Sequence, residues 1–580
     1  MSTQENRVSA REHFTVLFTF ILLTIIFTYP LIFEWTEQIR VGEGDAYWFL
    51  WNLWRFEQSF EKGEDLFFST QTFYPTGTSL FLSTTTPLLS FVSVPLQNVV
   101  GLLAAYNLLY LLSYPLSAYL MYLLAYHLTK NSWAAFLAGI VFAFSPYHSA
   151  HAYLGHLNLM HMQFIPFFFL FYLKLKEAAT FQRVVGGAIA VALLGYTEIM
   201  YLGLCLLYVL FDFLYDHLIY KKPTVRHTLT GIFSSLFLGF LLLSPYLFGF
   251  LYEIVTVEYT PYATLEFTSR YSVDLIAFFV PPSFHPILSS FFEWAYSALG
   301  KVNWLSAFIE SSVYLGISVL ALAIYARLKI KKYHIQKWFD FFLVAMVFAM
   351  GPFPIIFGYT IPFLLPYFFA YLVPFFSMFR VPARFDVFVM LTAAILVAYG
   401  YVQLQKRLSN RRRFLPYFLT LLILFEFWAP PPEPLDLSIH PLYYALAQDS
   451  ENGVIFDVPQ EDPLTFSHYN THLLYVQTVH NKTIVGGGLS RSPNYVFDFT
   501  KQSCVKNLAT LNFSTYCTQE EYNAQLGSDI RYVIYHKDAP PWLPHNSRIA
   551  MGNMERLFGS PVFEDEQLAV YCRFNCNNFT

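Results

Sequence analysis

The residues best suited to catalysis lie in the segment 41–55 (VGEGDAYWFLWNLWR), which follows the first apolar run. Asp45 stands just before a stretch in which aromatic residues such as Trp51 and Trp54 recur at helical spacing, a pattern typical of a helix in the headgroup layer of a membrane. A carboxylate beside glycine at a lipid–water boundary can act as a general base on an incoming hydroxyl or amide. The same carboxylate can also serve as the N-cap of the following helix, and the residues alone leave both interpretations open.

Two arginines, Arg380 and Arg384, lie four residues apart before a later apolar run. On a helix they would share one face, and guanidinium groups match the oxygens of a phosphate. Such a pair would also neutralise the charge that develops when a phosphate departs. Arginines at this depth can instead anchor the chain to lipid phosphates, so two interpretations stand.

Four histidines lie within one short stretch: His148, His151, His156 and His161. Their spacing allows metal binding, since imidazole is a common ligand, but hydrogen-bonded wall residues are the usual alternative. Three acidic residues are further candidates: Glu198 lies where two apolar runs meet, Glu310 at the mouth of the run 304–328, and Asp274 in the long outer loop 251–303. An acid in such a place is a candidate for function because exposing it to lipid would be costly.

The elements that must position these residues follow from composition. The 580 residues are 56% hydrophobic and only 13% charged, against roughly 25% charged in soluble domains, which excludes a water-soluble globule. The net charge of −4 indicates no nucleic-acid partner. Eleven apolar runs predict membrane-spanning helices: 14–34, 103–128, 133–147, 159–173, 184–198, 199–219, 228–250, 304–328, 338–356, 385–403 and 414–429.

Alternate loops differ in positive charge, which predicts orientation. One set of loops holds 19 Lys and Arg residues and the opposite set, before residue 430, holds seven. Because cytoplasmic loops retain positive charge, we expect a cytoplasmic N-terminus and an extracytoplasmic segment 431–580. The first run lacks a cleavage site and is expected to be an anchor. The short, proline-containing segment 87–100 is expected to be interfacial or re-entrant.

The tail, residues 431–580, predicts a separate α/β domain. Strand-like stretches at 453–458, 483–485, 531–536 and 568–572 alternate there with helical patterns such as 441–448 and 465–479. Four of the five cysteines lie in it: Cys504, Cys517, Cys572 and Cys576. In an extracytoplasmic domain they predict two disulfides, most simply one in each local pair, although three connectivities are possible. A zinc site is the alternative, but these spacings fit no common zinc finger. No nucleotide-binding glycine loop stands out elsewhere in the chain.

Several ordered motifs resemble the multi-pass membrane glycosyltransferases of the GT-C superfamily, and more narrowly a poorly characterised prokaryotic branch of it. These motifs are Gly44-Asp45, Trp51-Asn52-Leu53-Trp54, Phe73-Tyr74-Pro75, Tyr106-Asn107-Leu108, Phe142 to Pro146, Gly155-His156-Leu157, Glu310 with Tyr314-Leu315-Gly316, and Arg380 to Phe385. The resemblance implies a transmembrane domain over residues 1–430, with a first outer loop at 35–102.

GT-C enzymes move a sugar from a polyprenyl-phosphate carrier to an acceptor outside the cytoplasm. Their first outer loop carries an acidic residue that acts as the base or helps to hold a metal, and Asp45 corresponds to it. Many members have two adjacent acids there, whereas Gly44 separates Glu43 from Asp45 in this chain. The resemblance therefore leaves a divalent metal possible and no cofactor certain.

The expected function is that of an integral plasma-membrane glycosyltransferase with a polyprenyl-phosphate-linked donor and a glycan, lipid or protein acceptor. Asp45 is the expected base, and Arg380 with Arg384 the expected phosphate ligands. Residues expected to bind substrate or support the site are Glu43, Trp51, Asn52, His156, Glu198, Asp274 and Glu310. The alternative is a non-catalytic transporter or assembly factor for lipid-linked glycans, which should place charges along a midplane path; the spans contain few, such as Asp212 and Glu426.

Overall fold

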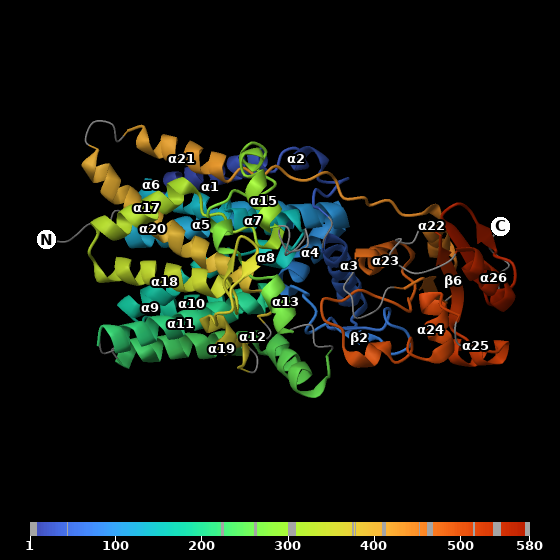
Figure 1. The fold of residues 1–580 in the computed structure, drawn as a ribbon. Helices are drawn as coiled ribbons and strands as arrows, with labels where there is room; N and C mark the ends of the chain where they lie inside the picture. Colours follow the sequence, from blue (N-terminus) through green and yellow to red (C-terminus); the bar gives the residue numbers. More distant parts are fainter. Residues whose placement is uncertain are drawn as a thin grey trace. The chain divides into compact units, whose positions relative to one another are not determined.

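The computed structural model describes residues 9–42, 45–221, 226–259, 264–299, 309–373, 376, 379–408, 413–451, 453–460, 468–513, 517–537 and 547–574. These residues are largely helical and form two compact units (Figure 1). Unit 1 comprises Met1–Gly42, Leu103–Pro245 and Pro261–Leu435, and unit 2 comprises Glu43–Leu102, Tyr246–Thr260 and Asp436–Thr580. Unit 2 thus contains both most of the expected first outer loop and the tail. The domain boundary expected near residue 430 stays a prediction.

Unit 1 is a helical bundle. Its elements are α1 (Ala10–Phe27), α2 (Leu31–Glu34), α5 (Leu102–Thr129), α6 (Ser132–Ala143), α7 (Pro146–Tyr153), α8 (Leu157–Met160), α9 (Phe164–Glu177), α10 (Phe181–Thr197), α11 (Ile199–Leu214), the π-helix η1 (Tyr215–Ile219), most of α12 (Arg226–Thr256), α13 (Leu265–Arg270), η2 (Leu275–Phe278), α14 (Leu288–Phe291), α15 (Glu293–Leu299), α17 (Ile317–Lys329), α18 (Tyr333–Ala349), the antiparallel pair β3 (Ile355–Ile356) and β4 (Tyr359–Thr360), α19 (Pro366–Tyr371), η4 (Pro382–Phe385), α20 (Asp386–Arg407) and α21 (Leu415–Glu426).

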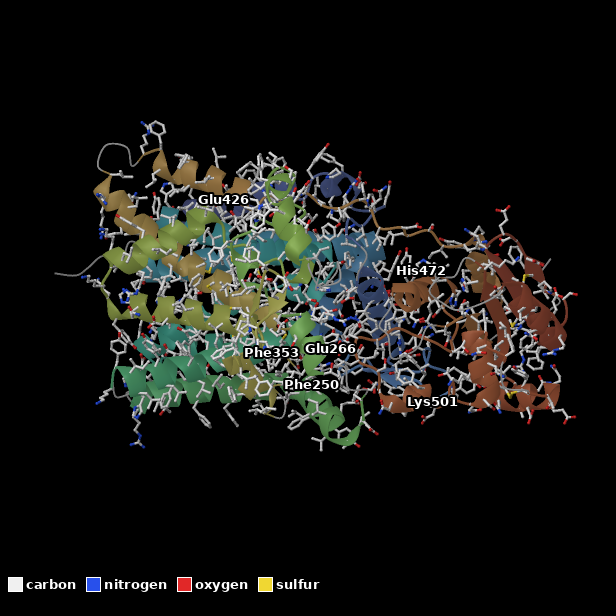
Figure 2. All side chains as sticks on the ribbon, in the orientation of Figure 1. Phe250, Glu266, Phe353, Glu426, His472 and Lys501 are labelled. Carbon is white, nitrogen blue, oxygen red and sulfur yellow. A yellow bond between two sulfur atoms is a disulfide. The ribbon has the colours of Figure 1, made fainter. Side chains whose placement is uncertain are left out.

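Helix α20 is the centre of this bundle. It packs against α6, α17 and α18. In the helical segment Pro382–Arg407, which contains α20, 78% of the most apolar 18-residue stretch is buried, against 22% in α1 and 28% in α12. Gly400 permits the contact with α17, because a Cβ at this position would lie 2.4 Å from the carbonyl oxygen of Leu322. Glu426 of α21, labelled in Figure 2, accepts the N–H of Ser318 at 3.1 Å and so joins α21 to the start of α17.

Five described helices are long and apolar enough to cross a membrane: Ala10–Phe27, Leu102–Thr129, Ile199–Ile219, Arg226–Thr256 and Pro382–Arg407. Pro87–Val100, Phe181–Thr197 and Leu415–Glu426 are shorter apolar helices. Each of the eleven apolar runs overlaps a helix, but the total of eleven spans stays a prediction. The chain is therefore a multi-pass membrane protein.

One end of the bundle carries a buried ionic network. Lys337 Nζ lies 2.5 Å from Asp212 Oδ1 and 2.9 Å from Asp216 Oδ1, and Lys176 Nζ contacts the same two aspartates. The four residues come from α9, α11, η1 and α18. Asp212 thus lies within ion-pair distance of two lysine ammonium groups, one from α9 and one from α18.

Unit 2 contains α3 (Ala46–Lys62), the pair β1 (Phe68–Ser69) and β2 (Thr78–Ser79), α4 (Pro87–Val100) and the end of α12, followed by the elements of the tail. Those are α22 (Pro441–Gln448), β5 (Val454–Val458), α23 (His468–His480), η5 (Asn494–Phe497), α24 (Ser503–Thr510), α25 (Gln519–Leu526), β6 (Ile530–His536), α26 (Ser547–Phe558), β7 (Phe563–Glu564) and β8 (Leu568–Cys572).

The tail strands form one sheet in the order β5-β6-β8-β7. β5 and β6 are parallel, and β8 is antiparallel to both β6 and β7. Strands β5 and β6 are buried along their whole length, as expected for strands covered on both faces. The apolar side chains of β5 and β6 pack with those of α24, α25 and α26 in one core.

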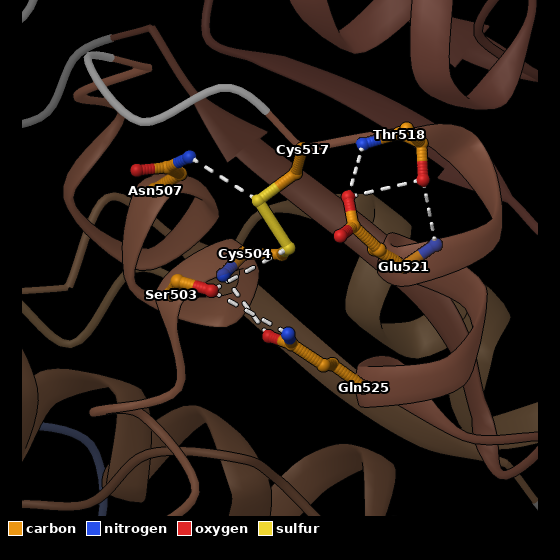
Figure 3. Close-up of a disulfide and its surroundings, with 7 residues drawn as sticks. All are labelled: Ser503, Cys504, Asn507, Cys517, Thr518, Glu521 and Gln525. Carbon is orange, nitrogen blue, oxygen red and sulfur yellow. Dashed lines mark hydrogen bonds between the residues drawn. A yellow bond between two sulfur atoms is a disulfide. The ribbon is translucent and has the colours of Figure 1, made fainter.

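A disulfide joins Cys504 in α24 to Cys517 just before α25, as predicted (Figure 3). Next to it, Thr518 and Glu521 form a capping box at the start of α25, an arrangement that satisfies exposed backbone donors at a helix N-terminus. The second predicted pair involves Cys576, which lies outside the described residues, so the pairing of Cys572 stays a prediction.

Candidate active site

The histidine-rich stretch forms a break between helices of unit 1. Ser145 caps α7 and Pro146 occupies its first turn, a combination that starts a new helix directly after α6. Gly155 has φ +68°, which glycine adopts readily, and turns the chain back after α7. As a result His151 and His156 meet, with their Nδ1 atoms 2.9 Å apart.

Glu310 completes a buried group with these histidines. The potential ligand atoms of His151, His156 and Glu310 all lie within 4.8 Å of one another, and the residues are 0%, 8% and 6% exposed. Arg384 Nε donates to Glu310 Oε1 at 2.9 Å. The sequence marked His156, Glu310 and Arg384 separately, and the structure brings them together.

Glu198 belongs to the same region. It caps α11 by accepting the N–H of Met200 at 3.0 Å, and Asn158 of α8 donates to its second oxygen. Glu198 also interacts electrostatically with Arg384. Two carboxylates thus act on the charge of one guanidinium.

The group could hold a divalent metal. Burial, then the charges of His156 and Arg384, holds the pKa of His151 well below its usual range, so this imidazole is neutral as a metal ligand must be. Within the described part of the chain, His151 Nε2 is buried without a hydrogen-bond partner. Two imidazoles and a carboxylate suit Zn²⁺, and Glu310 retains Oε2 while Oε1 binds Arg384. The residues therefore fit such an ion.

Arg380 and Arg384 do not share a helical face, so this expectation is wrong. Residues 380 and 381 are not helical, Pro382 begins the short η4, and α20 starts only at Asp386. Proline fixes its own φ and disfavours a helical conformation before it. The Arg380 guanidinium instead lies over the ring of Phe267, 5.5 Å from its centroid.

The carboxylate of Asp274 is occupied by hydrogen bonds to the backbone. Its carboxylate accepts the N–H groups of Ile276 at 2.9 Å, Phe357 at 3.2 Å and Gly358 at 2.7 Å. Burial raises the pKa of Asp274, and these three donors oppose that effect. The residue ties η2 to the β3–β4 turn.

Asp45 occupies the N-cap position of α3 in unit 2, but its side chain makes no capping hydrogen bond to the described helix. Glu43 and Gly44 lie outside the described residues. Trp51 Nε1 donates to Gln477 Oε1 and Asn52 Nδ2 to the carbonyl of Thr85, each at 2.7 Å. Trp51 and Asn52 therefore fix helix α3 within its unit.

Gly42, just before the segment that contains Asp45, packs closely against Tyr153. The N–H of Gly42, three residues before Asp45, donates to the carbonyl of Tyr153 at the end of α7. A Cβ at position 42 would lie 2.4 Å from the ring of Tyr153, so only glycine fits without a shift.

Sequence reasoning missed two residues near Arg384. Asn158 is neutral, and neither its charge nor its spacing distinguishes it. Asp386 is fully buried, and both of its carboxylate oxygens lack a hydrogen-bond partner among the described residues. Its position in the first turn of α20 made it resemble an ordinary helix-start acid.

A family model described as a domain of unknown function (DUF6311) matches residues 15–426. No curated protein sequence matches the chain. Among solved structures, the oligosaccharyltransferase of Archaeoglobus fulgidus in complex with Zn and sulfate is similar, with a TM-score of 0.52 and 12% identity. That match covers 90% of this chain and 68% of the other.

The arabinofuranosyltransferase AftD from Mycobacteria is also similar, with a TM-score of 0.57 and 14% identity. The match covers 98% of this chain but only 40% of AftD, so the chain spans less than half the length of that relative. At such identities the likeness concerns the fold. It confirms the predicted GT-C fold.

Proposed function

The chain belongs to the DUF6311 family and has the GT-C fold, and we propose that it is an integral membrane glycosyltransferase that uses a polyprenyl-phosphate-linked sugar. The acceptor is a glycan, lipid or protein outside the cytoplasm. In this proposal the N-terminus is cytoplasmic and residues 431–580 form an extracytoplasmic domain, as the distribution of Lys and Arg predicts.

The observation that carries the proposal is the ion pair of Arg384 and Glu310 beside His151 and His156, inside an apolar bundle. Burying charges is costly, and apolar residues of similar volume would stabilise a bundle equally well or better. A charged group in this place is best explained by a charged ligand. A phosphate ester is such a ligand, and a guanidinium is well suited to it.

Arg384 is the proposed phosphate ligand. Its bond to Glu310 uses Nε and orients the guanidinium plane, while the Nη groups carry four further N–H donors. These donors would stabilise the negative charge that grows on the leaving phosphate. Arg380 would add positive charge near the phosphate. Its guanidinium lies over the ring of Phe267 and is not oriented by Glu310 as that of Arg384 is.

In the proposed reaction, a nucleophilic group of the acceptor attacks the anomeric carbon of the sugar. The bond from that carbon to the phosphate oxygen breaks, and its electron pair leaves with the polyprenyl phosphate. Asp45 takes the proton from the acceptor as general base. Asp45 belongs to unit 2, and its role is inferred from the sequence resemblance.

A divalent metal is proposed as an optional part of this site. His151, His156 and Glu310 would hold it, in keeping with the Zn bound in the complex of the Archaeoglobus oligosaccharyltransferase. When bound, the ion would supply positive charge to an oxyanion.

The test is release of polyprenyl phosphate by the purified protein in proteoliposomes. A panel of polyprenyl-phosphate sugars is offered with an extract of envelope glycans and glycolipids, and protein-free liposomes serve as the control. Protein-dependent release together with a glycosylated product is expected. Binding of the carrier without release from any donor would contradict the proposal and favour a carrier-handling protein.

A further inference from the structure

A cavity of unit 1 lies between α1, α6 and α21, which are neighbours in Figure 1, and none of its lining residues belongs to the group around Arg384. Its volume is about 450 Å³, and Thr15, Thr19, Trp133, Phe136 and Tyr417 are among its lining residues. This volume falls in the range of small-ligand sites, roughly 300–1,000 Å³. The cavity lies at the N-terminal end of α6. His151 lies on α7, which follows the C-terminal end of α6, so the cavity and the histidines are at opposite ends of this helix.

The helices beside the cavity present apolar side chains outwards. Phe14 and Phe18 on α1 are 70% and 57% exposed, and Phe418 and Leu421 on α21 are 62% and 70% exposed. In a membrane bundle such side chains face lipid tails, so a cavity between them is accessible to lipid chains.

Both threonine hydroxyls that α1 contributes to the cavity lining already donate to backbone carbonyls. Thr15 Oγ1 donates to the carbonyl of Arg11 at 2.9 Å, and Thr19 Oγ1 donates to the carbonyl of Thr15 at 2.8 Å. The hydroxyl of Thr420 on α21 is buried, so it too offers no donor to an occupant of the cavity.

The polar end of the cavity is formed by Glu12 and Ser132. The Ser132 hydroxyl donates to the Glu12 carboxylate, which fixes its position. Nearby, the rings of Trp133 and Tyr417 meet edge to face with centroids 5.1 Å apart. A carboxylate with aromatic rings is the combination that recognises an ammonium group.

We propose that this groove binds a diacyl phospholipid with an ammonium headgroup, of the phosphatidylethanolamine type. One acyl chain occupies the cavity, and the ammonium group of the lipid lies against Glu12 and Trp133. Arg11 and Lys130, close to Glu12 and Ser132 in the sequence, supply positive charge for the lipid phosphate. This lipid is separate from the sugar donor, and the site does not depend on the proposed transferase activity.

The test is native mass spectrometry of the full-length protein in detergent. Phosphatidylethanolamine and phosphatidylglycerol with identical acyl chains are offered in equal amounts. The wild-type protein is expected to retain phosphatidylethanolamine roughly fivefold more, the size of effect expected for one partly exposed charge contact with an aromatic neighbour. Glu12→Gln should abolish this preference while retaining the acyl chain, and Thr19→Phe, which fills the cavity, should lower retention of both lipids.

Thr230→Phe is the matched control, since Thr230 is an exposed threonine of α12 outside the cavity. It should behave as the wild type. Equal retention of both lipids by the wild type, or an unchanged preference in Glu12→Gln, would overturn the proposal. A third arm offers undecaprenyl phosphate as competitor, and displacement of phosphatidylethanolamine by it would assign the groove to the carrier instead. If Thr19→Phe fails to fold, Glu12→Gln alone decides.

Discussion

Arg384 Nε and Glu310 Oε1 lie 2.9 Å apart, although 74 residues separate the two in the sequence. Glu310 is 7% and Arg384 23% exposed at the side chain, so the pair is largely removed from water. Removing one partner leaves the other charge buried without compensation. Effects of these residues on stability and on chemistry must therefore be separated experimentally.

Arg384→Ala should lower the free energy of unfolding by about 3 kcal/mol, because Glu310 is left without its cation. It should also weaken donor binding roughly tenfold or more, as expected for losing charge-assisted bonds to a phosphate. Acceptor binding should change little. Donor affinity is measured by competition with polyprenyl phosphate.

The double variant Glu310→Gln/Arg384→Met separates the two effects. It carries no unpaired charge and should regain most of the lost stability, while donor binding stays weak. An unchanged donor affinity in either variant would argue against Arg384 as the phosphate ligand.

Zinc binding should depend on His156. We expect the wild-type protein to bind one zinc ion and His156→Ala to lose it, because one of three ligands is removed. Metal content after dialysis against buffered zinc is measured by mass spectrometry. His217→Ala is the control, since His217 is exposed in η1. Zinc retained at full occupancy in His156→Ala would show that the ion binds elsewhere.

The carboxyl of Asp449 should make the tail sensitive to acid. Its oxygen Oδ2 lies 2.7 Å from the Tyr532 hydroxyl and 3.0 Å from Arg531 Nη1. Burial acts to raise the pKa, but these bonds, the Glu451 N–H and nearby cations hold it below its ordinary value. A pKa lower in the folded than in the unfolded state stabilises the fold above about pH 4, and this contribution is lost as the pH falls through the folded pKa.

Asp449→Asn should accordingly lower stability by roughly 2 kcal/mol at pH 7 and by much less at pH 2. Hydrogen exchange of β6 in the full-length protein measures this difference at both pH values. A loss of protection of equal size at pH 2 and pH 7 would mean that the ionised form is not responsible.

The sequence predicted site residues best where a charged residue stands beside an apolar run. Charged side chains next to apolar runs marked Glu198, Glu310 and Arg384 one by one, since lipid penalises such residues. It could not assemble them, because their proximity depends on which helices of the bundle are neighbours. Neutral Asn158 carries no such penalty, and nothing in the sequence distinguished it.

The error at Arg380 has a local cause. The four-residue spacing predicted a shared helical face, but Pro382 delays the start of α20 to Asp386. In the tail, by contrast, three of the four strand-like stretches coincide with β5, β6 and β8, whereas 483–485 contributes only an isolated bridge between Ile484 and Ile455. The grouping of α3 with the tail comes from side-chain contacts such as Trp51 with Gln477, which no local pattern reveals.

The central claim, that a carboxylate of the first outer loop is the base, is tested most directly by Asp45→Asn in the proteoliposome release assay. Asparagine preserves size and the N-cap position of α3 but cannot accept the proton. We expect Asp45→Asn to lose sugar transfer, with expression, thermal stability and binding of polyprenyl phosphate as in the wild type. Sugar transfer at the wild-type rate by Asp45→Asn would contradict it.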